Sequence, residues 1–299
     1  MALVLLNPHA QGGRAALRIP ALRAWLAAHA PNAQLAAPEA LSDSVDLLQS
    51  LPEGSRVVVV GGDGTLNRWL PMLLARRLTV GLVPMGSGND SARAWGVDGM
   101  HWAQALTLAL QGPAQAIDAG LAHWRDLQGQ TYEAPFLSSL TAGFDSAVGL
   151  RALNGPSWLR GLPRYLWATL HELIHLRHWD LTLHSDGHFK HQGACLFASS
   201  LNTPTFGSGM PAVPHAQLAD GQLDALLAGT FGRLGALLML PRLLIGQHLG
   251  HPRIGCWPYR QLDIACTKGV PLAADGEYLG EAQHVRIHCQ AASLLVVRR

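Results

Sequence analysis

Apolar residues in the first third of the chain alternate between short β-branched runs and helical stripes. Val57–Val60 is a continuous β-branched run, which is typical of a buried strand. Five apolar residues after it recur at helical spacing: Leu66, Trp69, Leu70, Leu73 and Leu74. The pattern therefore predicts a strand, a short turn and a helix that Thr65 caps or opens.

The same order of strand, loop and helix occurs twice more. The apolar run 2–6 is followed by a loop of small and polar residues that begins at Asn7, and then by a helical stripe. The run 80–83 is followed by the loop 84–90 and another helix. Because the carboxyl ends of parallel strands share one edge of a sheet, we expect the three loops to meet at one ligand site.

Beyond Asp118 the helical pattern gives way to strands. One helical stretch, 163–178, interrupts this region. Strands are expected at 134–140, 179–185, 192–200, 222–228, 261–266 and 284–297. At 299 residues, the chain is long enough for an α/β domain followed by a second, mostly β domain.

The turn after Val60 has the composition of a phosphate-binding loop. Gly61, Gly62 and Gly64 lack Cβ atoms, so a ligand can approach bare backbone N–H groups at the start of a helix. The sequence has neither GxxxxGK[ST] nor the GxGxxG spacing of dinucleotide-binding folds. Asp63 would repel a phosphate unless a metal ion or a hydrogen-bond network lies between them.

Composition narrows the choice of partners. The net charge of +2, without long basic runs, argues against a nucleic-acid partner. The four cysteines form no CxxC pair, which indicates a reducing cytosol. The N-terminus lacks the basic region of a signal peptide, and no stretch reaches the roughly 18 apolar residues of a spanning helix. Any membrane contact is therefore expected to be peripheral.

Four motifs together carry a resemblance. GGDGTLN (61–67), PMGSGND (84–90), LADGQLDALL (218–227) and ADGE (274–277) occur in this order. With them the chain resembles the diacylglycerol kinase catalytic-domain family, especially bacterial lipid kinases that are similar to sphingosine and ceramide kinases. The resemblance covers nearly the whole length.

The resemblance implies an α/β N-terminal domain with a parallel, Rossmann-like sheet and a mostly β, sandwich-like C-terminal domain, with the nucleotide in a cleft between them. The expected domains are 1–118, joined by a returning segment 292–299, and 119–291. The former would bind ATP and the latter the lipid.

The resemblance also assigns residues. For ATP it implies Asn7, Gly61, Gly62, Asp63, Gly64, Thr65, Leu66, Asn67, Gly86, Ser87, Asn89 and Asp90. For Mg²⁺ it implies the side chain of Asp220 and the backbone carbonyls of Gln217 and Gln222. It makes Glu277 the proton acceptor, with Asp275 beside it, and it places Asp63, Asp90 and Asp118 in an acidic network. Three departures are visible in the sequence: Ser87 replaces the usual Thr, the first loop reads NPHAQGG, and residues 35–38 read LAAP where relatives often place a hydroxyl against the nucleotide.

The implied activity is Mg²⁺-dependent transfer of the γ-phosphate of ATP to a hydroxyl of diacylglycerol or a related lipid. A carboxylate base is expected because an alcohol is a poor nucleophile at neutral pH. The enzyme would be cytoplasmic and would bind the membrane peripherally while acting. The sequence does not decide which lipid is the acceptor, and it leaves a homodimer open.

Two alternatives stay open. An NAD kinase-like enzyme would phosphorylate a soluble acceptor with similar loops. HELIH at 171–175 matches the HExxH pattern of zinc hydrolases, in which two histidines bind zinc and the glutamate acts as base. His178 does not have the spacing of a third zinc ligand, so we interpret this helix as a wall of the lipid site or as a membrane-facing surface.

Overall fold

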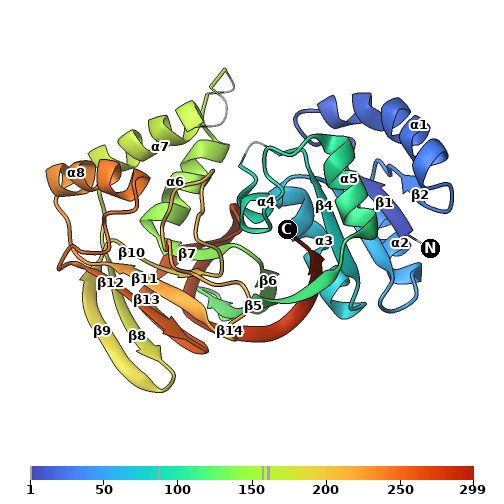
Figure 1. Cartoon of the computed structure of the whole chain (residues 1–299). Helices are drawn as coiled ribbons and strands as arrows, with labels where there is room; N and C mark the ends of the chain where they lie inside the picture. The colour runs from blue at the N-terminus through green and yellow to red at the C-terminus, as the bar shows by residue number, and fades with distance from the viewer. Residues whose placement is uncertain (1, 87, 157, 160–161) are drawn as a thin grey trace. The chain divides into compact units, whose positions relative to one another are not determined.

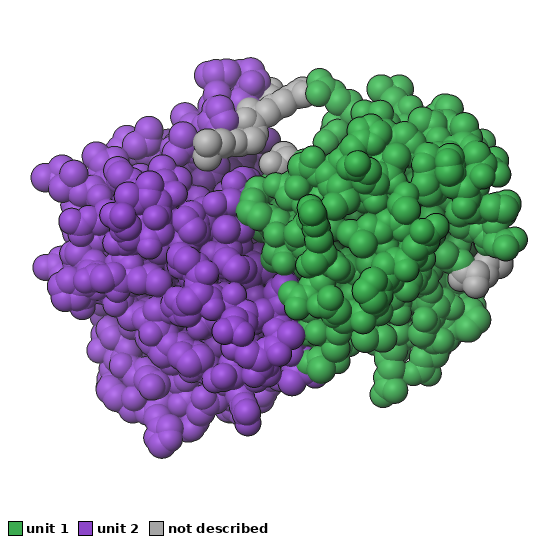
Figure 2. Space-filling view, in the orientation of Figure 1, with its two compact units in different colours: residues 1–117, 292–299 green, residues 118–291 purple. Residues whose placement is uncertain are grey.

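The computed structural model describes residues 2–86, 88–156, 158–159 and 162–299. The chain forms two compact units, coloured separately in Figure 2. Unit 1 comprises residues 1–117 and 292–299, and unit 2 comprises 118–291. Asp118, which the sequence analysis assigned to the first domain, is the first residue of unit 2.

Unit 1 contains a parallel sheet in the order β2, β1, β3, β4, followed by the last residues of β14. The strands β1, β3 and β4 are nearly all buried apolar residues, because helices cover both faces of such a sheet, whereas the edge strand β2 has no buried residue. Leu295 and Val296 pair with Thr79 and Val80, so the chain returns to this sheet after unit 2. The bounds are β1 Ala2–Leu6, β2 Gln34–Ala36, β3 Arg56–Gly61, β4 Thr79–Pro84 and β14 Glu277–Val297.

The helices of unit 1 follow its strands (Figure 1). Side chains of α1 and α5 pack against alternate residues of β1, β3 and β4 in one core. The bounds are α1 Ile19–His29, α2 Leu41–Ser50, α3 Asp63–Ala75, α4 Asp90–Ala94 and α5 Trp102–Gln111, with a 3₁₀ turn at Arg14–Arg18. The prediction that Thr65 caps α3 is wrong, because the helix begins at Asp63 with Gly62 as its N-cap. Gly62 keeps an extended backbone, with φ −113° and ψ −171°, and the helix starts at the next residue.

Unit 2 is built on antiparallel strands. One path runs β12, β11, β10, β7, β13, β14; β8 pairs with β13 and β9, and β5 pairs with β6. The core fills with alternate residues of these strands. The bounds are β5 Ala114–Asp126, β6 Thr131–Phe136, β7 Ser139–Gly143, β8 Trp179–Ser185, β9 His188–Cys195, β10 Phe197–Leu201, β11 Leu223–Ala228, β12 Ile254–Tyr259 and β13 Gln261–Ala274.

Three helices of unit 2, α6 Phe144–Leu153, α7 Leu162–Ile174 and α8 Arg233–Leu244, share a second core. The sequence analysis expected α7 but neither α6 nor α8. It also merged strands that the structure separates: 134–140 spans β6 and β7, and 192–200 spans β9 and β10. Leu196 lies between the latter two, and its N–H donates to Ala228 while its carbonyl accepts from Phe144.

Candidate functional site

The order of strands in unit 1 reverses between β1 and β3, which is where open α/β sheets bind ligands. The loops after these strands touch there. The Asn7 side-chain amide donates to Thr65 Oγ1 at 2.9 Å, and the Asn7 backbone N–H donates to the carbonyl of Val60 at 3.2 Å. Two predicted nucleotide-binding residues are thus joined at the carboxyl edge of the sheet.

The loop after β4 approaches the same place through two glycines. A Cβ on Gly62 would lie 2.6 Å from the Cα of Gly86, so any larger residue at position 62 would force the two backbones apart. Met85 N–H donates to the Gly61 carbonyl at 2.7 Å, and Gly86 N–H donates to Asn89 Oδ1 at 3.0 Å. The three loops therefore meet, as the sequence predicts.

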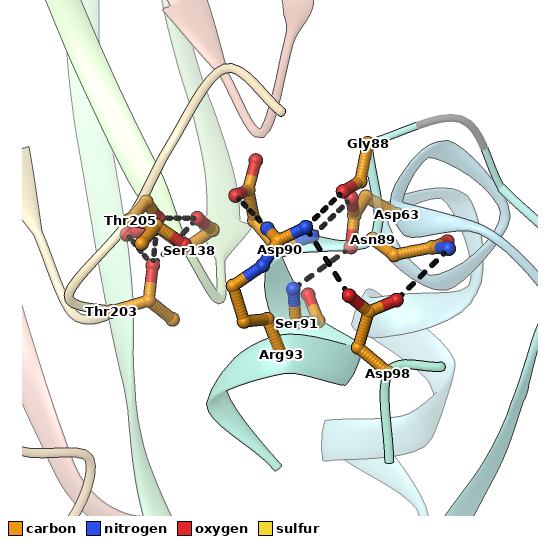
Figure 3. A network of polar contacts seen from close by, with 10 residues as sticks. All are labelled: Asp63, Gly88, Asn89, Asp90, Ser91, Arg93, Asp98, Ser138, Thr203 and Thr205. Carbon is orange, nitrogen blue, oxygen red and sulfur yellow. Dashed lines mark hydrogen bonds and ion pairs between the residues drawn. The ribbon is translucent and has the colours of Figure 1, made fainter. Parts of the chain in front are cut away.

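Asp63 joins two of these loops through backbone groups. Its carboxylate oxygens accept from the N–H groups of Asp90 and Ser91, at 2.9 and 3.0 Å (Figure 3). Both N–H groups belong to the first turn of α4, so Asp63 caps that helix from outside it. The sequence analysis required a metal ion or a hydrogen-bond network between this carboxylate and a phosphate; the structure shows that both carboxylate oxygens bond to backbone N–H groups of α4.

Asp90 is held in turn by Arg93, whose guanidinium lies 2.9 Å from Asp90 Oδ1 and 3.3 Å from Asp98 Oδ2 (Figure 3). Asp90 itself is buried. The sequence analysis missed Arg93, although a cation one helical turn after an acid in a phosphate-binding loop is a visible signal. Among the remaining predicted residues, Leu66 has a buried side chain, and Ser87 lies outside the described residues.

A small pocket of about 90 Å³ lies beside Asn7 and Thr65 within unit 1. Pro38, Ser44 and Arg68 also line it. Ser44 comes from the first turn of α2 and Arg68 from α3. The sequence analysis named neither residue, because only the fold brings these helices to the β1 loop.

In unit 2, Asp118 shapes the segment that carries the predicted Mg²⁺ ligands. Its Oδ2 accepts from Gly221 N–H at 2.7 Å, and its own N–H donates to the Leu218 carbonyl at 2.7 Å. Asp220 Oδ1 accepts from Gln222 N–H at 3.0 Å. Because Asp220 and Gln217 are exposed and offer only oxygen atoms, the segment suits the hard cation Mg²⁺.

The ADGE motif forms the hairpin between β13 and β14. Asp275 and Gly276 have φ values of 47° and 86°, which is the backbone of a two-residue hairpin turn, and Ala274 pairs with Glu277. The Asp275 carboxylate accepts three backbone N–H bonds of 2.8–3.0 Å, from Leu137, Ser138 and Ser139. Asp275 thus fixes the turn, and Glu277 follows as the first residue of β14.

The backbone segment that Asp275 holds is itself part of a hydroxyl network. Ser138 Oγ lies 2.8 Å from Thr203 Oγ1, which donates to the Thr205 carbonyl at 2.7 Å (Figure 3). Ser138 and Thr203 are buried, so these bonds satisfy hydroxyls that would otherwise destabilise the fold. The network joins the start of β7 to the loop after β10.

A cavity of about 280 Å³ in unit 2 is lined by Tyr278, the residue after Glu277. Leu150 of α6, Trp167 of α7 and Trp179 of β8 give it apolar walls. The Arg151–Glu172 ion pair, with Nε and Oε1 2.7 Å apart, also lines it. Asn154, Arg177 and Glu281 line it as well, so the cavity combines apolar walls with several charged and polar side chains.

Asp145 is a titratable residue that the sequence analysis missed. Burial raises its pKa to about 7, and Ser199 Oγ donates to it at 3.5 Å, which opposes that rise. It lies in the first turn of α6, immediately after β7 and Gly143. Gly143 has φ 112°, and a Cβ at this position would lie only 2.7 Å from the Leu196 carbonyl oxygen, so this turn requires glycine. The signal was the strand, glycine and acid order of TAGFD.

HELIH does not form a metal site in the described part of the chain. Glu172 is buried and paired with Arg151, and His178 Nε2 contacts the Phe231 carbonyl at 3.0 Å. The rings of His171 and His175 stack at 4.9 Å. Among described residues, only His215, Asp224 and Cys256 bring three ligand atoms of His, Cys, Asp or Glu close enough for a metal ion.

No helix in the described ranges is both long enough and apolar enough to cross a membrane.

Two family profiles match the chain. The diacylglycerol kinase catalytic domain matches residues 1–122, and the YegS C-terminal NAD kinase β-sandwich-like domain matches residues 138–298. Among curated proteins, a diacylglycerol kinase of Mycobacterium tuberculosis is 31% identical over 222 residues, which are 74% of this chain and 70% of that protein. The second unit therefore has a family match of its own.

Solved structures show the same fold. A diacylglycerol kinase of Bacillus anthracis superposes with a TM-score of 0.77 at 19% identity, covering 100% of this chain and 96% of the other. An NAD kinase of Archaeoglobus fulgidus in complex with ATP gives a TM-score of 0.55 at 10% identity, covering 100% and 94%. The α/β region and the β-sandwich-like region expected from the sequence are both confirmed.

Proposed function

The chain belongs to the diacylglycerol kinase catalytic-domain family with a YegS-type C-terminal domain, and we propose that it transfers the γ-phosphate of ATP to a hydroxyl of diacylglycerol or a related lipid. It is a lipid kinase of this family, and the family implies the use of ATP. The observation that carries the finer proposal is the meeting of the β1, β3 and β4 loops at the switch point of a parallel sheet.

The phosphates of ATP would lie against bare backbone in unit 1. Among the described residues, no side chain caps the N-terminus of α3, which begins after Gly62, and the α3 dipole favours negative charge there. Asp63 supports this arrangement because it holds the first turn of α4 in place. The pocket beside Asn7 and Thr65 would receive another part of the nucleotide. The expectation that the nucleotide binds between the two domains stays a prediction.

Mg²⁺ would be held by the Asp220 carboxylate and the backbone carbonyls of Gln217 and Gln222. Bound there, the ion would neutralise charge on the phosphate oxygens. The contribution of the chain is the shape of this segment, which Asp118 maintains through Gly221 and Leu218.

Glu277 would act as the proton acceptor for the lipid hydroxyl. As the hydroxyl oxygen bonds to the γ-phosphorus, its proton passes to the Glu277 carboxylate, and the bond from the γ-phosphorus to the oxygen bridging the β-phosphate breaks to release ADP. Asp275 is better suited to positioning, because three backbone N–H groups already occupy its carboxylate. The aromatic cavity at Tyr278 would receive the apolar part of the acceptor.

A lipid partner also accounts for the outer faces of α7 and α8, which contact each other. Leu166, Leu170 and Ile174 recur every four residues on α7 and are 41–62% exposed. Leu234 and Leu238 of α8 are 69% and 64% exposed. The exposed residues Arg233 and Arg242 begin and nearly end α8, and they suit an anionic membrane surface. We therefore propose peripheral membrane contact through this α7–α8 face.

Labelled phosphate transfer tests the acceptor class. The full chain would be incubated with γ-labelled ATP and dispersed diacylglycerol, monoacylglycerol, ceramide or sphingosine, and separately with NAD, with Mg²⁺ or with a chelator. We expect label in a lipid hydroxyl ester only with Mg²⁺. Label in NAD but in no lipid would replace the proposal with the NAD kinase-like alternative, whose fold the chain shares. If phosphate transfer to lipid persisted with the chelator, the reaction would not need Mg²⁺, and the Mg²⁺ site would be dropped from the proposal.

A further inference from the structure

Three potential metal ligands lie close together in unit 2, near the start of β11. His215 lies in the segment that precedes β11, Asp224 in β11 and Cys256 in β12. The register pairs Leu226 with Cys256 and Asp224 with Pro258, so Asp224 and Cys256 lie diagonally on the same face of the sheet. The His215 Nε2 atom is 3.7 Å from Asp224 Oδ1 and 3.9 Å from Cys256 Sγ. All the candidate ligand atoms lie within 4.8 Å of one another.

We propose that His215, Asp224 and Cys256 bind a divalent cation of the zinc type, with an open fourth position. Tetrahedral zinc brings neighbouring nitrogen, oxygen and sulfur ligands to about 3.3–3.7 Å from one another, so small side-chain rotations would close the site. The side chain of His215 is 59% exposed, which leaves a path for the ion and room for a water ligand. Thiolate and imidazole ligands favour zinc over Mg²⁺, which prefers oxygen.

The surroundings of the three side chains favour a cation. Asp224 is a buried carboxylate only 8% exposed, and such a group is costly to ionise without a nearby positive charge. The thiolate is the form of cysteine that binds metal, so an arriving cation would displace the Cys256 proton to solvent.

This site would be separate from the proposed Mg²⁺ segment but linked to it by the chain. His215 is two residues before Gln217, and Asp224 is two residues after Gln222. A bound ion would therefore tie both ends of the segment 215–224 to β11 and β12. The proposal goes beyond lipid phosphorylation and needs neither ATP nor lipid.

Titration of the reduced full chain with Co²⁺, a spectroscopic substitute for Zn²⁺, tests the site. We expect one Co²⁺ per chain, a near-ultraviolet thiolate-to-metal charge-transfer band, and loss of that band when Zn²⁺ is added. His215→Ala and Cys256→Ser should each weaken Co²⁺ binding by more than about 100-fold, since loss of supporting residues alone costs about 10- to 100-fold.

The matched controls are His188→Ala, which changes an exposed histidine of β9, and Cys289→Ser, which changes another half-buried cysteine of unit 2. Both should bind Co²⁺ like the wild type, and circular dichroism would verify that every variant is folded. Absence of the thiolate band from the wild type would overturn the proposal. So would a band that persists in Cys256→Ser, because the thiolate would then belong to another cysteine.

Discussion

At the scale of single residues, three carboxylates, one in unit 1 and two in unit 2, act on backbone groups. Asp63 binds the first turn of α4, Asp118 binds Gly221, and Asp275 binds the segment 137–139. A carboxylate that accepts charge-assisted bonds from backbone N–H groups fixes a loop more firmly than a neutral side chain does. These acids therefore determine the shapes of the loops that carry the residues proposed to bind ATP, to bind Mg²⁺ and to accept the proton.

Asp63→Asn should weaken the use of ATP while the fold persists. The amide keeps one acceptor, but its NH₂ group faces a backbone N–H of α4 that then lacks a partner, which costs about 1–3 kcal/mol. If the loop shape carries nucleotide binding, kcat/KM for ATP should fall by roughly 10- to 100-fold. Asp46→Asn, an exposed change on α2, is the control. An unchanged kcat/KM for ATP in Asp63→Asn would show that the loop needs no such support.

Asp145 should make stability depend on pH. Its pKa is raised from 3.8 to about 7, so between these values the folded state binds a proton that the unfolded state has released. Stability contributed by the protonated form is therefore present at low pH and is lost as the pH rises through about 7. The slope is at most about 1.4 kcal/mol per pH unit.

Asp145→Asn should remove this slope, because the amide does not titrate. Urea unfolding at about pH 5 and about pH 8 would measure it. We expect the wild type to lose more stability than Asp145→Asn over this interval, with Asp46→Asn behaving like the wild type. Equal losses in wild type and Asp145→Asn would refute a raised pKa at this carboxyl.

At the scale of elements, the sequence predicted the strand and helix units of the α/β region because each of three apolar runs is followed by a glycine-containing loop and then by a helical stripe. Boundaries were less predictable. Gly62 rather than Thr65 is the N-cap of α3, since the close packing of Gly62 on Gly86 is a tertiary contact that no local pattern reveals. The split of 134–140 depends likewise on Asp275, which is distant in sequence and binds Leu137 and Ser138.

The exposed apolar stripes of α7 and α8 lead to a prediction about membranes. Leu170→Asp combined with Leu238→Asp should reduce binding to anionic vesicles by more than about tenfold, because two apolar side chains would be replaced by charges. Activity on a short-chain, monomeric diacylglycerol should change little. Leu17→Asp, at a residue of unit 1 that is 79% exposed, is the control. Vesicle binding unaffected by the double change would exclude this face as the membrane contact.

At the scale of the whole molecule, the chain leaves unit 1 at Ile117 and returns to it at Ala292. Side chains of the returning strand alternate between buried and exposed positions: Leu294 is fully buried, whereas its neighbour Leu295 is 39% exposed. Leu294→Ala should therefore lower the free energy of unfolding by about 2–5 kcal/mol. Leu295→Ala, the matched control, should cost less than about 1 kcal/mol. If urea unfolding gave similar losses of unfolding free energy for the two variants, the Leu294 side chain would not be part of the core of unit 1.

The candidate site was predictable to the extent that it is local. Motifs identified the loops of Asn7, Gly61–Asn67 and Gly86–Asp90, and the structure joins these loops through direct hydrogen bonds. The motifs did not reveal the pocket at Arg68 or the cavity at Tyr278, since residues from separate helices and strands line both. The acceptor depends on such cavities, which sequence patterns do not describe.

The central claim is that Glu277 accepts the proton of a lipid hydroxyl as the hydroxyl takes the γ-phosphate of ATP. The most direct test measures labelled phosphate in diacylglycerol produced by the wild type, Glu277→Gln and the control Glu133→Gln, which changes an exposed carboxylate of β6. We predict that Glu277→Gln lowers kcat by about 10²- to 10⁴-fold with ATP still bound, and that Glu133→Gln matches the wild type. Turnover of Glu277→Gln at the wild-type rate would contradict the account.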